Sequence, residues 1–176
     1  MNGKVVGMVI VASGLIAGAA VYYLQLYGFY TPVEATNVDD VQVTTLSGAA
    51  PEPILYENFN AIDAESSPIR YRACFTTPQS LPMMTETYAL YDDAVPLNAP
   101  GWFDCFDADA IADALDTGAA LAFLGTFNVH YGIDRIVAVH EDGRGWAWHQ
   151  INHCGEEVFD GNPPPEGCPP VPERTN

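Results

Sequence analysis

The stretch that decides the fold is DRIVAVHEDGRGWAWHQI, residues 134–151. Apolar and polar residues alternate on both sides of the Asp142-Gly143 pair, which is typical of β-strands. An Asp-Gly pair between two such runs favours a two-residue type I′ turn. We therefore predict a β-hairpin with strands at residues 134–140 and 145–151.

A two-residue turn fixes which side chains share a face of this hairpin. Val139 would lie opposite Trp146, and Val137 opposite Trp148, on one side of the sheet. The other side would hold Ile136, Ala138, Ala147, His149 and Ile151. Because both sides are largely apolar, we expect a central position for the hairpin.

Two more elements precede the hairpin. Residues 69–75, IRYRACF, alternate with period two and predict a strand that places Ile69, Tyr71, Ala73 and Phe75 on one side. Residues 107–115 predict a helix, with Asp107 as its N-cap and Gly118 as its stop signal. This order of elements predicts an α+β fold with a small, mainly antiparallel sheet.

The N-terminal segment has a different character. Residues 5–30 contain no ionisable Asp, Glu, Lys, Arg or His, and residues 5–24 would span about 30 Å as a helix. We predict a transmembrane anchor at residues 1–30. A signal peptide is the alternative, because residues 17–19 are small enough for a cleavage site. We expect no cleavage, since it would expose the apolar run at residues 21–27.

Charge predicts the orientation of this anchor. Lys4 precedes it, whereas Glu34, Asp39 and Asp40 follow it, which favours a cytoplasmic N-terminus and an exported remainder. The chain has 6 Lys and Arg against 23 Asp and Glu, a net charge of -17. This charge excludes nucleic acid as a partner and favours basic proteins, such as small electron carriers.

Small residues gather on one face of the predicted anchor. Gly7, Gly14, Gly18 and Gln25 fall within about 20–40° of one direction around the helix. The glycines permit close approach of another helix, and an amide in lipid gains from a hydrogen-bonding neighbour. We predict that this face packs against other transmembrane subunits.

The exported part is expected to have three segments. Residues 31–60 mix Pro, Ala, Thr and acidic residues and predict an extended stalk, with one short strand at 41–46. Residues 61–153 form the predicted α+β domain, and residues 154–176 a Pro-rich tail.

Four cysteines, Cys74, Cys105, Cys154 and Cys168, predict disulfides in an exported domain. Three pairings are possible. We favour Cys74–Cys105 and Cys154–Cys168, because the second pair would close a short loop over the prolines at 163–165.

The sequence shows no strong catalytic or metal-binding pattern. His149, His153 and Cys154 are close in sequence, but the predicted strands would hold His140 and His149 about 13 Å apart. Only a helical turn would bring His149 and His153 together. There is no CxxC, HExxH, GxSxG or P-loop pattern, and the many carboxylates single out no acid or base. We predict no catalytic residue, no metal and no cofactor.

Arg70 and Arg72 are two of only five arginines and share a face of the predicted strand. Their guanidinium groups could bind a carboxylate of a partner or a small anion. Pairing with the protein's own carboxylates is the alternative.

Three strings, at residues 62–75, at residues 99–106 and in the hairpin, resemble an uncharacterised family of single-span proteins of Rhodobacter-type alphaproteobacteria. The resemblance extends over about residues 1–152. It implies a Gram-negative inner membrane with the domain in the periplasm, and it implies no activity.

Our leading hypothesis is a non-enzymatic accessory or assembly subunit of an inner-membrane complex, with a respiratory or other energy-transducing complex as the expected host. The alternative is a membrane-tethered periplasmic enzyme or ligand-binding module with a cleft near Arg70, Arg72 and His149. A deep pocket with convergent polar groups would favour the alternative.

Overall fold

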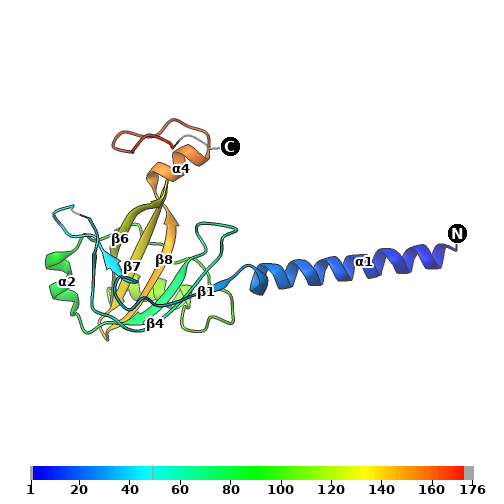
Figure 1. The fold of residues 1–176 in the computed structure, drawn as a ribbon, viewed down its shortest axis with the longest axis horizontal. Helices are drawn as coiled ribbons and strands as arrows, with labels where there is room; N and C mark the ends of the chain where they lie inside the picture. Colours follow the sequence, from blue (N-terminus) through cyan, green and yellow to red (C-terminus); the bar gives the residue numbers. More distant parts are fainter. Residues whose placement is uncertain (1, 49, 173–176) are drawn as a thin grey trace.

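A long helix leads into one sheet domain in the computed structural model, which describes residues 2–48 and 50–172. Helix α1 (Gly3–Tyr23) continues through the π-helical turn η1 (Leu24–Gly28) into a six-stranded sheet (Figure 1). The predicted α+β class, with its N-terminal apolar helix and mainly antiparallel sheet, is confirmed.

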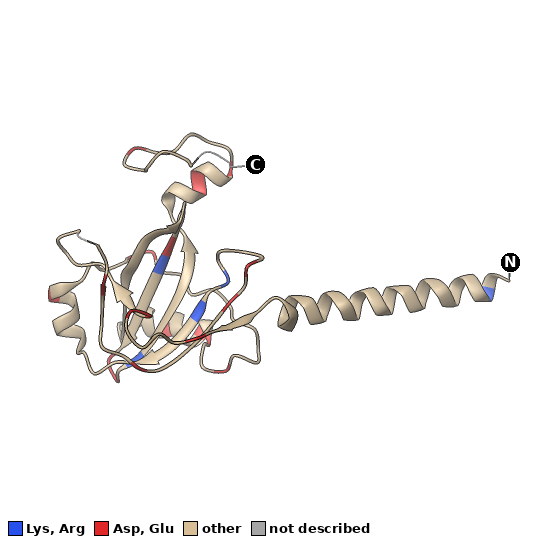
Figure 2. Cartoon of the chain, in the orientation of Figure 1, with Lys and Arg blue, Asp and Glu red and all other residues tan. Residues whose placement is uncertain are grey.

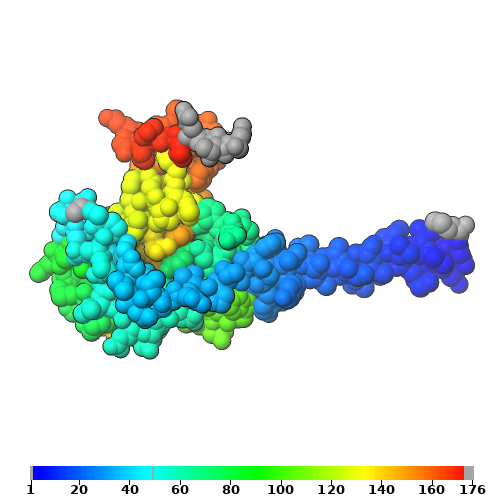
Figure 3. All heavy atoms as spheres, in the orientation of Figure 1, coloured from blue at the N-terminus to red at the C-terminus, as the bar shows by residue number. Residues whose placement is uncertain are grey.

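The segment Gly3–Gly28 is the one helix of the described residues that is long and apolar enough to cross a membrane. It projects from the domain, and none of its apolar window is buried (Figure 3). Lys4 lies in its first turn, and Figure 2 shows the acidic residues on the domain. These features suit a membrane anchor and would equally suit a signal sequence.

The main sheet has the strand order β1-β4-β5-β8-β7-β6, and all neighbouring strands are antiparallel. Its strands are β1 (Thr31–Val33), β4 (Glu57–Asp63), β5 (Arg72–Thr76), β6 (Ala120–His130), β7 (Ile133–His140) and β8 (Arg144–Ile151). A small second sheet pairs β2 (Gln42–Val43) with β3 (Glu52–Pro53). The domain helices are α2 (Leu81–Thr87), α3 (Ala108–Asp116) and α4 (His153–Phe159).

Strands β7 and β8 form the predicted central hairpin, but the predicted register is wrong by one residue. Val139 lies opposite Gly145, and Val137 opposite Ala147. Three residues, 141–143, connect the strands. Among them only Gly143 has a positive φ, 90°, whereas a two-residue type I′ turn requires positive φ at both central residues.

The corrected register exchanges side chains between the two faces of the sheet. Trp146 and Trp148 share a face with Ile136 and Ala138, and pack with Phe103, Phe106 and Ile111 from α3 and the chain before it. The opposite face holds Val137, Val139 and Ala147, which pack with Val41, Val43 and Met84 from β2 and α2. Both faces of the sheet are therefore covered, which explains why the hairpin sequence places apolar residues on both of them.

Residues 31–60 are not the extended stalk that the sequence predicted. Strand β1 pairs with β4 at the edge of the main sheet. Val41 and Val43 are fully buried in the core under that sheet. The strands in this segment are two or three residues long before β4, too short to produce a recognisable alternation. The domain therefore begins directly after η1.

Helix α3 has the predicted ends. The side chain of Asp107 accepts hydrogen bonds from the backbone nitrogens of Asp109 and Ala110, both at 3.1 Å. Gly118, which follows the helix, has a φ of 75°. The local signals at 107–118 were therefore sufficient to place this helix.

The two disulfides have the favoured pairing, Cys74–Cys105 and Cys154–Cys168. The described residues include no free cysteine. The segment expected as a Pro-rich tail begins inside helix α4, which Asn152 caps through hydrogen bonds to the backbone nitrogens of Cys154 and Gly155. The second disulfide ties the following Pro-rich loop back to this helix.

Candidate functional site

The glycine face of α1 is open along its length. A Cβ atom added at Gly7, Gly14 or Gly18 would lie more than 4 Å from any heavy atom outside the helix's own neighbouring backbone, among the described residues. The domain therefore does not cover this face, and the backbone there is accessible to another helix. The packing role predicted for these glycines stays a prediction.

Gln25, the fourth residue predicted for this face, makes a contact within the chain. Its side-chain oxygen accepts a hydrogen bond from the guanidinium Nη2 of Arg70, at 2.9 Å. At the next residue, the indole Nε1 of Trp102 donates to the carbonyl of Leu26, at 2.6 Å. The end of the apolar helical segment is therefore hydrogen-bonded to the domain.

The two arginines predicted to share a role lie in different surroundings. Arg72 is only 3% exposed, and its guanidinium donates to the carbonyls of Ile69, Tyr71, Leu97 and Asn98 at 2.7–3.1 Å. Burial lowers the pKa of Arg72 to about 10. Arg70 is half-buried beside α1. Arg72 thus holds loops of the domain together by donating to backbone carbonyls. Within the described residues it does not pair with the protein's own carboxylates, which was the alternative drawn from the sequence.

His149 is fully buried and held in one tautomer. Its Nε2 accepts a hydrogen bond from Nε of Arg135 at 3.1 Å, so Nδ1 carries the proton and donates to the carbonyl of Pro68 at 2.7 Å. Burial and the positive charge of Arg135 lower the pKa of His149 to about 3. A neutral imidazole with both nitrogens bonded has no free position for acid or base chemistry near pH 7.

His153 is the histidine that approaches other potential metal ligands. Its Nε2 lies 3.3 Å from the sulfur of Cys168 and 3.6 Å from that of Cys154. This is the one group of three such ligands found in residues 2–48 and 50–172. Both sulfurs belong to a disulfide, so the group holds no thiolate ligands in this state. Helix α4 and the Cys154–Cys168 disulfide bring His153 close to the two sulfurs, a proximity that the predicted strands did not include.

A groove of about 620 Å³ runs between β6, β8 and the loop around Tyr91. At its base Asp134 is 3% exposed, and its Oδ1 accepts hydrogen bonds from the side chain of Asn152 at 2.6 Å and the backbone of Asn128 at 2.8 Å. Burial raises the pKa of Asp134 above its usual value. The Tyr91 hydroxyl donates to Oδ2 at 3.4 Å, and burial raises its own pKa to about 12. The base of the groove is thus a polar network whose members bond to one another, except for the buried Nδ2 of Asn128, which has no hydrogen-bond partner among the described residues.

Gln150, on the wall of the same groove, is also engaged within the domain. Its side-chain oxygen accepts from the backbone of Val95 at 2.8 Å, and its nitrogen donates to the carbonyl of Asp93 at 2.7 Å. These bonds hold the loop that follows Tyr91 against the sheet. The groove therefore offers few unbonded polar groups to a ligand.

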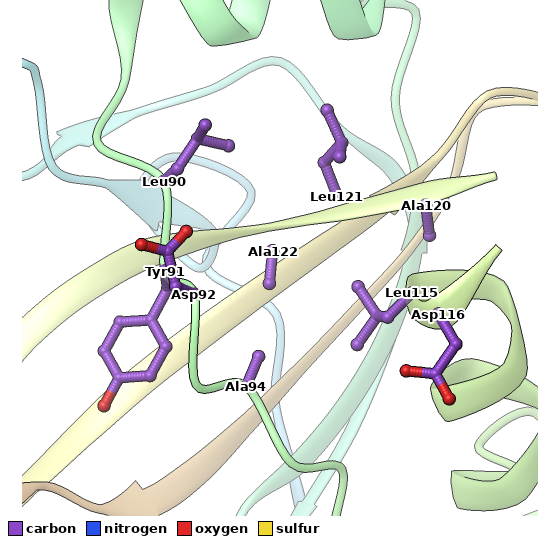
Figure 4. A pocket seen from close by; sticks show the side chains of 9 residues that line it. All are labelled: Leu90, Tyr91, Asp92, Ala94, Leu115, Asp116, Ala120, Leu121 and Ala122. Carbon is purple, nitrogen blue, oxygen red and sulfur yellow. The ribbon is translucent and has the colours of Figure 1, made fainter. Parts of the chain in front are cut away.

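A smaller cavity of about 260 Å³ lies beside it, between the Tyr91 loop, the end of α3 and β6. Its lining is mostly aliphatic, including Ala94, Leu115 and Ala122, with the carboxylates of Asp92 and Asp116 at opposite ends (Figure 4). The lining contains no histidine, cysteine or basic residue. The two carboxylates therefore have no cationic or imidazole partner in this lining.

Sequence reasoning missed two features of the site. The Asp134 network joins residues from β6, β7, the N-cap of α4 and a loop, so no local pattern could show it. The exposed position of Trp102, by contrast, could have been predicted, because Pro100 and Gly101 signal a turn that can expose the residue after them. The backbone nitrogen of Phe103 indeed bonds to the carbonyl of Pro100 at 2.8 Å, which buries Phe103 and leaves Trp102 outside.

Comparison with known families places the chain in one of them. The family of unknown function DUF6446 matches residues 41–169, well over half of the chain, so the protein belongs to this family. The predicted membership of an uncharacterised family is confirmed, but the match omits α1 and includes the Cys154–Cys168 loop, unlike the expected extent of 1–152. No curated protein and no solved structure matches the chain.

Proposed function

We propose that this protein is a non-enzymatic accessory or assembly subunit of a larger inner-membrane complex. The observation that carries the proposal is the open glycine face of α1, where Gly7, Gly14 and Gly18 have no neighbour in the described chain. In lipid, helices associate through close packing at such small residues. A respiratory or other energy-transducing complex remains our expectation for the host.

The fastened end of the helix gives this face a fixed direction relative to the domain. Gln25 and Leu26 are hydrogen-bonded to Arg70 and Trp102, so α1 cannot rotate freely about its axis without breaking these bonds. A partner helix packed on the glycines would therefore meet the domain in one orientation. Such a connection suits a subunit that positions its domain on a complex.

The proposed location follows from charge. Lys4 lies before the apolar segment and acidic residues lie after it, so the N-terminus is cytoplasmic and the domain is periplasmic in this proposal. In this proposal the segment stays uncleaved, because cleavage after residue 19 would expose the apolar run at residues 21–27. Its acidic domain would attract basic periplasmic proteins over a distance of about a Debye length, and high salt would weaken that attraction.

A membrane-tethered enzyme or small-ligand-binding module is the second candidate, and the groove above Asp134 is the observation in its favour. Against it, the polar groups in the groove bond mainly to one another and to the backbone. Ligand sites instead present a few polar groups aimed into the open space. A ligand would have to displace these internal bonds.

The test compares variants that place the same side chain, leucine, on different sides of α1. Gly14→Leu and Gly18→Leu fill the glycine face, whereas Ala12→Leu and Ala20→Leu lie about 140° away from it. After mild detergent extraction of native membranes, we expect the glycine variants to lose co-purifying subunits and the alanine variants to retain them. Retention by all four variants would contradict the proposal.

A further inference from the structure

Aromatic and cationic side chains of the domain gather at the point where the apolar helix ends. Besides its hydrogen bond to Leu26, the Trp102 ring stacks on Tyr27, with centroids 6.2 Å apart, and meets the edge of Tyr30 at 6.1 Å. These partners are more than 70 residues away in sequence. The contact therefore joins a loop of the domain to the helix end.

Trp102 differs from the other two tryptophans in exposure. It is 37% exposed, whereas Trp146 and Trp148 are 7% and 0% exposed. A tight turn at residues 100–103 holds it outside the core. An indole that is packed on tyrosines along one side and uncovered on the other is amphipathic, the character of aromatic residues at membrane interfaces.

Arg70 of the domain also contacts this helix end. Its guanidinium bonds to Gln25 and lies 5.6 Å from the ring centroid of Tyr30. The Nη1 atom of the same guanidinium is buried and has no hydrogen-bond partner among the described residues. The domain thus brings both a cation and an indole to one helical turn.

The length of α1 places this turn in the interfacial layer. From Gly3 to Tyr23 the helix measures about 31 Å, close to the thickness of about 30 Å of a bilayer's hydrocarbon core. Leu26 then lies about 3–5 Å beyond the edge of the hydrocarbon. The headgroup region on each side is about 5–8 Å deep, so Leu26 and the indole bonded to it fall within that region.

We propose that the Trp102 loop (residues 99–102) contacts phospholipid headgroups, so that the domain lies directly against the bilayer. The proposal rests on the anchoring role of α1 in the proposed function and not on its partner helix. Zwitterionic lipid is the expected occupant, because a chain with a net charge of -17 disfavours a strongly anionic surface. The absence of a stalk in the described residues 31–48 and 50–60 agrees with this placement.

The experiment uses the full chain reconstituted into phosphatidylcholine vesicles whose acyl chains carry bromine near the headgroup. Bromine quenches tryptophan fluorescence on contact, and the emission of Trp102 is obtained by subtracting the spectrum of Trp102→Phe from that of the unchanged protein. We expect bromine to remove about half of this difference emission, because an interfacial indole touches the upper acyl chain. Trp102→Tyr provides an independent subtraction if the phenylalanine variant folds poorly.

Three outcomes separate the possibilities. Quenching by bromolipid, with weak quenching by aqueous acrylamide, supports the proposal. Strong acrylamide quenching without a bromine effect, or shielding from both quenchers, overturns the lipid contact. Extraction of the protein from the vesicles by alkaline carbonate would instead show that α1 does not span the bilayer, which would overturn the anchoring part of the proposed function as well.

Discussion

Helix α1 and the sheet domain are both rich in apolar residues, but they differ in how far these side chains are exposed. In the domain Ile136 and Val139 are completely buried, whereas in α1 Leu15 and Ile16 are about 70% exposed. The domain therefore satisfies its apolar surface within the chain, and the helix requires lipid or another helix to cover its surface. Because of this difference, we expect the protein to contact its partners through the helix.

The junction between the two regions combines both behaviours. Trp102 and Arg70 belong to the domain, but their partners Leu26 and Gln25 belong to the end of the helical segment. The family match at residues 41–169 omits the helical segment and β1, and it includes Arg70 and Trp102. The predictions below test whether the domain is indeed independent of the helix.

The largest effect is expected from the core of the domain. Trp148→Ala removes a fully buried ring that packs edge-on against Phe106. We expect a loss of about 3–5 kcal/mol in the free energy of unfolding of the domain, measured by denaturant titration of the full chain in detergent. Leu15→Ala in α1 is the control and should leave this value unchanged. An equal effect of both substitutions would contradict the independence of the two regions.

The two disulfides should differ in their effect on the sheet. Cys74 lies in β5, and its bond to Cys105 closes a loop that contains α2, so replacing both by Ser should cost about 3–4 kcal/mol. The Cys154–Cys168 bond ties a Pro-rich loop to α4 at the end of the hairpin, so its removal should cost the sheet less than about 1 kcal/mol. Unfolding of each serine pair, followed by near-UV circular dichroism, gives both values. Similar losses would mean that the C-terminal loop unfolds together with the sheet.

The stability of the domain should depend on His149 in acid. The pKa of His149 is about 3 in the folded protein and about 6.5 when unfolded, so between these values the unfolded chain binds the extra proton. Stability attributable to this residue is therefore intact above pH 6.5 and is lost as the pH falls toward 3. Between pH 7.5 and 4.5 the unchanged protein should lose about 2–3 kcal/mol more than His149→Gln. Parallel losses in the two proteins would show that His149 titrates normally.

The smallest effect on the domain is expected from the glycine face. Gly14→Leu and Gly18→Leu should change the free energy of unfolding by less than about 0.5 kcal/mol, because neither glycine contacts the domain. The same denaturant titration measures this. A larger change would mean that α1 packs on its own domain in a way that the structure does not show.

Local chemistry explains which parts of the fold could be predicted from sequence. The N-cap at Asp107, the alternation around Ala73 and the long apolar helix each depend on neighbouring residues, and the N-cap and the apolar helix are confirmed. The strand predicted at residues 69–75 is confirmed only in part, because β5 begins at Arg72 and Ile69 lies in the turn before it. The hairpin was placed correctly, but its register depended on the φ values around Asp142, which the Asp-Gly pair does not determine alone.

Tertiary contacts explain the rest. Strand β6 was missed although it is the longest strand of the described sheet, and β1 was assigned to a stalk because its pairing with β4 involves residues about 30 positions away. The same limit applies to the candidate sites. Arg72 looked available in an alternating strand, but carbonyls from a loop that starts after residue 90 surround its guanidinium.

The central claim, that the glycine face of α1 is the surface that meets a partner, is tested most directly by photocrosslinking in native membranes. A photoreactive residue is placed at one of four positions. Val11 and Val21 lie about 40° from the glycine direction around the helix, and Ile16 lies about 180° from it. Phe127 lines the groove of the domain. We predict protein adducts from Val11 and Val21, and none from Ile16 or Phe127. Adducts from Phe127 alone, or equal adducts from all three helix positions, would contradict the account.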